Sequence, residues 1–178
     1  VAYSYIGPEL TRAVYRNGTI GKAKDHLEAT AKKLDERLKR TGGRGVISVN
    51  KALVTQSSAA IPFIPLYFIL LKKVMLEKNV EEGCIEQMYR LFATRLYRQD
   101  GIISVDQEGL IRMDDWEMRE DVQSEVLDSW NQLSAETLKK VADLEGFQKD
   151  FLKLFGFGIE KVDYNQDVPI NQMLPSAA

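Results

Sequence analysis

The sequence has almost none of the residues that usually bind transition metals or form disulfides. Its 178 residues include one cysteine, Cys84, and one histidine, His26. One thiol cannot form an internal disulfide, and one thiol with one imidazole falls short of the usual zinc ligand set. These absences exclude a disulfide framework and argue against a zinc site. They fit a protein of the reducing cytoplasm.

The sequence also lacks a charge excess and a long apolar run. Lys and Arg number 24 against 26 Asp and Glu, a net charge of −2, which argues against nucleic acid as the main partner. The longest unbroken apolar stretch, residues 59–71, has thirteen residues and contains Pro62 and Pro65. It is too short to cross a bilayer, and the prolines disfavour a straight helix. We therefore expect no membrane span.

The start of the chain shows neither a signal sequence nor a methionine. Val1 opens directly on an apolar, strand-like run. The length and the 44% hydrophobic content are ordinary for one soluble globular domain. We expect that an amino-terminal part of the protein is missing from this sequence.

Short apolar runs alternate with helical segments in the first half. VAYSYI (1–6) and GVISVN (45–50) are predicted strands, and a helix is predicted over 19–40. Its apolar positions share one helical face: Leu27, Ala31, Leu34 and Leu38. A strand, helix, strand order predicts an α/β layer with a parallel sheet.

The second half is predicted to be mainly helical. Helices are expected from Pro65 and over 80–97, 115–131, 135–142 and 144–155, a β-hairpin over 102–113, and an irregular tail from Val168. Two parallel strands are too few for a complete doubly wound sheet, and no glycine-rich phosphate loop follows a strand. The predicted fold class is α/β: the C-terminal half of a Rossmann-like parallel sheet with many helices and a small β-hairpin.

A tyrosine and two lysines near the start could form a proton-donor pair. The pKa of a free tyrosine lies near 10, so a nearby ammonium is needed to stabilise the phenolate. Tyr15 and Lys24 are nine positions apart, about 180° on one continuous helix, so they converge only if Asn17-Gly18 breaks the helix. Lys22 would share the Tyr15 face of an unbroken helix. The residues alone leave the choice between Lys22 and Lys24 open.

Other candidates have plainer interpretations. The loop 50–56 follows a strand, where α/β proteins place ligands, but it also reads as a strand-to-helix connection with a cap. Cys84 is expected to be inert core, and His26 a surface residue. The acidic run 114–117 is expected to begin a helix rather than bind a metal.

Several segments together resemble one family. YSYIGPELTRAVYRNGTIGKAK (3–24) is similar to the active-site segment of the NADH-dependent trans-2-enoyl-CoA reductases, with their Tyr-x8-Lys signature. Four further segments resemble the same family in the same order: SVNKALVTQSSAAIPFIPLY (48–67), EGCIEQMYRLFATRLY (82–97), MDDWEMREDVQ (113–123) and DYNQDV (163–168). The chain thus resembles an enoyl thioester reductase of the short-chain dehydrogenase/reductase type over nearly its whole length.

The resemblance implies a role for each candidate residue. Tyr15 is the implied proton donor, and Lys24 holds the ribose of NADH and favours the ionised phenol. Tyr5 is implied to contact the substrate near its thioester carbonyl, and the apolar region after Ala59 to cover the acyl chain. The implied cofactor contacts of the second stretch are Leu53, Val54 and Thr55. The implied reaction reduces the trans-2 double bond of an enoyl-CoA or enoyl-acyl-carrier-protein thioester in fatty acid synthesis.

The resemblance also implies what this chain lacks. Residues 1–178 correspond to the C-terminal catalytic and substrate-covering part of a single Rossmann-like domain, without the N-terminal cofactor-binding half. We expect this part alone to be inactive and to need that half as its partner. The alternatives are a non-catalytic fragment or binding module derived from such an enzyme, and a short-chain-type reductase acting on ketones.

Overall fold

A three-stranded parallel sheet organises the first two thirds of the chain. The computed structural model describes residues 1–167, and the predicted irregular tail from Val168 lies outside the described residues. The strand order is β1-β2-β3, with bounds Ala2–Ser4, Ile47–Val49 and Leu110–Arg112. Ala2 pairs with Ile47, and Ile47 with Leu110. The predicted parallel pairing of the first two strands is confirmed, and with it the α/β class.

Helices and turns fill the rest of the described chain. The α-helices are α1 Arg12–Tyr15, α2 Thr19–Leu38, α3 Gln56–Ala59, α4 Ile64–Glu77, α5 Cys84–Arg90, α6 Glu120–Asn131, α7 Leu138–Val141 and α8 Leu144–Lys153. Two 3-10 turns and one π-helix complete the elements: η1 Glu9–Thr11, η2 Lys39–Thr41 and η3 Leu91–Leu96. Among the described residues, no helix is both long and apolar enough to cross a membrane.

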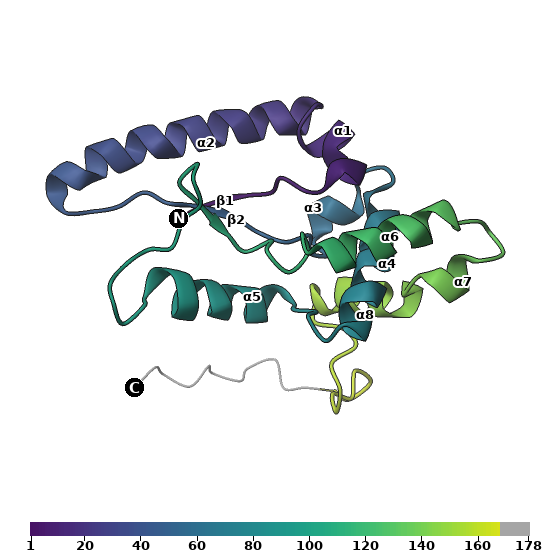
Figure 1. Ribbon diagram of the computed structural model, residues 1–178. Coiled ribbons are helices and arrows are strands. Elements are labelled where there is room, and N and C mark those ends of the chain that lie inside the picture. The colour runs from purple at the N-terminus through teal and green to yellow at the C-terminus, as the bar shows by residue number, and fades with distance from the viewer. Residues whose placement is uncertain (168–178) are drawn as a thin grey trace.

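The sheet is covered on both faces, as the alternation of side chains along its strands requires. One face packs on α2 through Ala31, Ile47, Val49 and Leu110. The other face packs on α5 and η3 through Val46, Leu91, Ile111 and Met113. Figure 1 shows the long α2 above the strands and α5 below them.

The main core lies beside the sheet, around α4. Its apolar residues are buried on nearly every side of the helix, including Tyr67, Phe68, Leu70, Leu71, Val74 and Met75. α6 and α8 pack against α4, and Figure 1 shows α3, α4, α6, α7 and α8 gathered at one end of the molecule. A helix that is apolar all round needs such complete cover.

The predicted hairpin is wrong. The turn exists, since the Asp106 carboxylate accepts from the backbone N–H groups of Glu108 and Leu110, each at 2.9 Å. However, residues 102–105 form no strand, and Leu110 begins β3, which pairs in parallel with β2. Leu110 and Ile111 point to opposite faces of the sheet, and both are buried because the sheet is covered on both faces. An isolated hairpin would leave one of its two faces in solvent.

The predicted apolar face of α2 is only partly buried. Ala31 is 6% exposed, but Leu34 and Leu38 are 49% and 40% exposed. The helix has 20 residues, so it is about 30 Å long, whereas a three-residue strand spans about 10 Å. The C-terminal part of α2 therefore extends beyond the sheet that it covers.

The break between α1 and α2 depends on Gly21. A methyl group at Gly21 would lie 2.1 Å from the Arg16 carbonyl oxygen, so only glycine lets α2 pack this closely on the end of α1. We expect Gly21→Ala to lower the free energy of unfolding by about 2 kcal/mol through overpacking. Urea unfolding followed by tryptophan fluorescence measures this.

The matched control is Gly43→Ala, because a methyl group there would come no closer than 3.3 Å to Leu38 Cβ and 3.5 Å to the Leu38 carbonyl oxygen. Equal stability of the two variants would show that the close approach of α1 and α2 is not needed.

Candidate active site

Tyr5 and Tyr15 meet face to edge. Tyr5 follows β1 and Tyr15 ends α1, and their ring centroids lie 4.5 Å apart at an angle of 82°. Gly7 turns the chain between them with φ +71°, and a side chain there would meet Thr11 and the Tyr5 ring within 3 Å. The turn at Gly7 thus brings together two tyrosines that the resemblance assigns to one site.

The Tyr15 ring is buried but its hydroxyl is not engaged. Only 6% of the residue is exposed, yet its hydroxyl forms no hydrogen bond within residues 1–167. Among residues 1–167, the fully buried side-chain nitrogen and oxygen atoms without a hydrogen-bond partner are Gln87 Oε1 and Arg95 Nε. The Tyr15 hydroxyl oxygen is not one of them, so it is accessible to solvent. A phenol held by its ring with an open O–H can donate to a ligand.

The pKa of Tyr15 is raised to about 12, first by burial and then by the negative charge of Glu117. The resemblance led us to expect that Lys24 favours the ionised phenol. In the described chain burial and the Glu117 charge both favour the neutral phenol, and the role of Lys24 stays a prediction.

The structure distinguishes the two lysines that the sequence left open. Lys24 is half-buried, its ammonium donates to the Tyr3 carbonyl at 3.4 Å, and burial lowers its pKa. The Lys22 side chain is 79% exposed and lies 3.9 Å from Asp25. Lys24 therefore faces β1, while Lys22 points to solvent. No described contact joins Lys24 to Tyr15.

Glu117 joins the tyrosines to the segment that follows β2. Its carboxylate is fully buried and accepts from Tyr5 at 2.8 Å, from Tyr67 at 2.6 Å and from the Ala52 N–H at 2.6 Å. Burial raises the pKa of Glu117, while these hydrogen bonds oppose that shift. Burial and the Glu117 charge raise the pKa of Tyr5 and of Tyr67 well above their usual values.

The sequence analysis placed Glu117 only in an acidic run at a helix start. The structure places that helix later, since α6 begins at Glu120. Asp114 and Asp115 bind arginines, and no group of three potential metal ligands forms among residues 1–167. The prediction of a helix start is therefore wrong for this run. No local pattern marks Glu117, because its partners lie 50 to 112 positions away.

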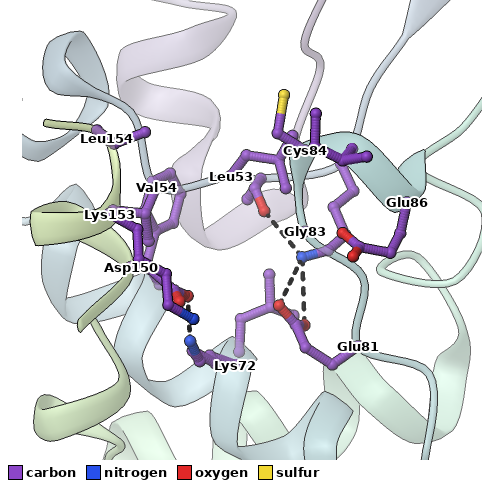
Figure 2. Close-up of a pocket in the computed structure, with 15 residues that line it drawn as sticks. Leu53, Val54, Lys72, Glu81, Gly83, Cys84, Glu86, Asp150, Lys153 and Leu154 are labelled. Carbon is purple, nitrogen blue, oxygen red and sulfur yellow. Dashed lines mark hydrogen bonds and ion pairs between the residues drawn. The ribbon is translucent and has the colours of Figure 1, made fainter. Parts of the chain in front are cut away.

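The predicted cofactor stretch divides between a cavity and a helix cap. Leu53 and Val54 line a cavity of about 310 Å³ between α4, α8 and residues 81–86. Figure 2 shows the two residues at the cavity, opposite Glu81 and beside the ion pair of Lys72 with Asp150. None of Tyr5, Tyr15 and Lys24 lines it.

Thr55 is exposed and caps α3. Its hydroxyl accepts from the Ser58 N–H at 3.1 Å, and the Ser58 hydroxyl accepts from the Thr55 N–H at 2.9 Å. The plain interpretation of the loop as a capped connection is thus confirmed for this residue.

The structure also reports on the burial of Cys84 and of the apolar region after Ala59. Cys84 is exposed at the first turn of α5, so its assignment to inert core is wrong. The buried side of this segment is formed instead by Gln87 on α5 and by Leu91 at the start of η3. The apolar region after Ala59 is mainly core within α4, and Ile61 and Phe63 before it stay only partly buried.

Two protein families match separate parts of the chain. Residues 1–97 match the family described as "Trans-2-enoyl-CoA reductase catalytic region", and residues 105–168 match "Enoyl reductase FAD binding domain". The chain is 58% identical over 177 residues to an enoyl-[acyl-carrier-protein] reductase [NADH] of Coxiella burnetii. It is 60% identical over 171 residues to a trans-2-enoyl-CoA reductase [NADH] of Brachyspira hyodysenteriae.

A solved structure shares the fold. The trans-2-enoyl-CoA reductase of Treponema denticola, solved in complex with NAD, matches with a TM-score of 0.89 and 52% identity over 97% of this chain and 43% of that chain. The two curated relatives are matched over 99% and 96% of this chain, but over only 43% of their own length. On the match over residues 1–97, the chain belongs to the trans-2-enoyl-CoA reductase family.

Proposed function

We propose that this chain is the proton-donating part of an enzyme that reduces the trans-2 double bond of enoyl-CoA or enoyl-acyl-carrier-protein thioesters with NADH, in fatty acid synthesis in the cytoplasm. Family membership and the names of both curated relatives support this proposal. The observation that carries it is the buried Tyr15 ring, packed on Tyr5 at 4.5 Å, whose hydroxyl forms no hydrogen bond within residues 1–167.

We propose NADH rather than a flavin as the cofactor. The second family description names FAD, but both relatives are named for NADH and the Treponema structure holds NAD. The donor set fits a nicotinamide dinucleotide, because Lys24 has one long hydrogen bond and can still donate to a ribose hydroxyl. When bound, NADH supplies the hydride that adds to the β-carbon of the substrate.

The chain's own residues then handle the charge and the proton. Hydride addition leaves negative charge on the thioester oxygen, where an oriented phenol stabilises it most. Tyr15 donates to that oxygen and then gives its proton to the α-carbon, which completes the saturated thioester. Tyr5 contacts the substrate near the same carbonyl, and Leu53, Val54 and Thr55 contact the cofactor. Ile61 and Phe63, partly exposed, contribute to the cover of the acyl chain.

We propose further that a second part of the enzyme completes the sheet. β1 is the edge strand of the three-stranded sheet in the described residues, although parallel sheets are normally larger. The chain matches 43% of the length of the Coxiella relative, so the rest of such an enzyme has room for a cofactor-binding part. The Tyr-x8-Lys spacing of Tyr15 and Lys24, in a chain with a parallel sheet, also supports a relationship to the short-chain dehydrogenase/reductase type.

The test compares this chain alone with the complete enzyme, meaning this chain joined to an amino-terminal part such as that of the Coxiella relative. We expect crotonyl-CoA-dependent oxidation of NADH by the complete enzyme. We expect none by the chain alone, because the proposed neighbour of β1 and the proposed phosphate-binding part would both be absent from that sample.

Adding the amino-terminal part as a separate polypeptide should restore the reaction. The reductase proposal would be overturned by a complete enzyme that folds and binds NADH but leaves crotonyl-CoA unchanged. Equal activity of the chain alone would instead overturn the need for a second part.

A further inference from the structure

The Glu117 carboxylate is the meeting point of three separate elements. Oε1 accepts from Tyr5 after β1 and from Tyr67 on α4, and Oε2 accepts from the backbone N–H of Ala52 after β2. Gln123 on α6 closes the cluster by donating to the Glu117 carbonyl at 2.6 Å. Both oxygens of one buried side chain therefore fix groups that lie far apart in sequence.

No cation neutralises this carboxylate within residues 1–167. The Lys51 charge lowers the pKa of Glu117, but the Lys51 ammonium binds Glu81 at 3.2 Å and the Ala52 carbonyl at 3.2 Å. A buried charge without an ion partner costs free energy, which the three hydrogen bonds to the carboxylate offset. Packing alone therefore does not explain a glutamate at this position.

The groups that Glu117 holds belong to the two halves of the proposed reaction. Tyr5 packs directly on Tyr15, the proposed proton donor. Ala52 directly precedes Leu53 and Val54 in the proposed cofactor stretch. Because Tyr5 donates its proton to Glu117, its phenol is fixed in one orientation, and Tyr15 keeps the open hydroxyl.

We propose that Glu117 is a positioning residue of this enzyme, which holds the Tyr5 phenol and the segment 52–55 in fixed relation through its two carboxylate oxygens. The inference rests on the proposed function, since it specifies what that site needs in order to align the proton donor with the cofactor. A displacement of about 1 Å at such a site can lower the rate about 100-fold.

Glu117→Gln in the complete enzyme tests the proposal. A glutamine has one acceptor oxygen, so its amide N–H₂ must face either the tyrosines or the Ala52 N–H. We expect kcat to fall about 100-fold, with the KM for crotonyl-CoA changed much less. The matched control is Glu82→Gln, a buried glutamate whose partners, Arg90 and Gln87, lie outside the site. We expect it to retain kcat.

A second readout separates positioning from general damage to the fold. The Glu117 charge helps to raise the pKa of Tyr5, Tyr15 and Tyr67, so its removal should let these tyrosines ionise at lower pH. The other charged group that acts on the cluster is Lys51. The buried tyrosines, which ionise last in an ultraviolet titration, should therefore do so at lower pH in Glu117→Gln than in the unmodified and Glu82→Gln enzymes.

The outcomes are distinct. Unchanged kcat in Glu117→Gln, or lost activity with an unmoved tyrosine titration, overturns the positioning role. If Glu117→Gln does not fold, Glu117→Asp carries the test, because it keeps the charge but shortens the reach. We then expect lower kcat with a normal titration, and unchanged kcat overturns the role. If the unmodified enzyme does not reduce crotonyl-CoA, the proposed function fails, and the titration still reports on Glu117.

Discussion

Tyr15→Phe is expected to lower kcat of the complete enzyme about 1,000-fold, within the usual range for removal of a positioned acid. The substitution removes the open hydroxyl and keeps the ring that packs on Tyr5. NADH binding should stay within about threefold, because no cofactor contact is assigned to this hydroxyl. Steady-state kinetics with crotonyl-CoA and fluorescence titration with NADH measure the two effects.

The control for this variant is Tyr89→Phe. Tyr89 lies on α5 and is 76% exposed, so the loss of its hydroxyl should leave kcat unchanged. Full activity of Tyr15→Phe would remove Tyr15 from the role of proton donor. Loss of NADH binding along with activity would instead point to a collapse of the site.

Lys24→Ala is expected to lower kcat/KM for NADH about 10- to 150-fold, the range for one charged hydrogen bond. The Lys24 ammonium is half-buried against the Tyr3 carbonyl, and its remaining donors are placed beside β1. The effect should appear mainly in the KM for NADH, since the ribose contact is made in both ground state and transition state.

Lys22→Ala is the matched control, because it removes the same charge two positions away from a side chain that is 79% exposed. It should change kcat/KM for NADH less than about threefold. Equal losses in the two variants would indicate a general charge effect. A loss confined to Lys22→Ala would reverse the assignment.

The sequence predicted the elements whose signals are local. The 19–40 helix, the break at Asn17-Gly18 and the two apolar strand segments all appear, because periodicity and glycine act within a few residues. The turn at residues 106–109 was also recognised, but not the partner of the strand that follows it. Strand pairing depends on which buried surface is available, and that information is not local.

The burial of single residues was harder to predict. Cys84 belongs to an apolar helical pattern, yet α5 has seven residues and turns only Gln87 fully inward. Leu34 and Leu38 follow the helical face, but the sheet ends before them. For α2 the pattern gave the face correctly and the extent of the sheet decided exposure, whereas on α5 the buried residue is Gln87 rather than Cys84.

The candidate site shows the same limit. Tyr5, Tyr15 and Lys24 were selected by resemblance, and the structure adds the contacts of each residue. The sequence does not single out Glu117 or Tyr67, since one stands in an acidic run that is expected to begin a helix and the other in an apolar stretch. Only the folded chain shows that the two side chains meet, with O···O 2.6 Å.

The most direct test follows the two hydrogens that the reaction adds. The complete enzyme would convert crotonyl-CoA with NADH carrying deuterium at its transferable position, and NMR of the butyryl-CoA product would locate the label. We expect deuterium at the β-carbon, and deuterium at the α-carbon when unlabelled NADH is used in heavy water. Cofactor deuterium at the α-carbon, or a product that carries none from the cofactor, would contradict a hydride reduction completed by the Tyr15 proton.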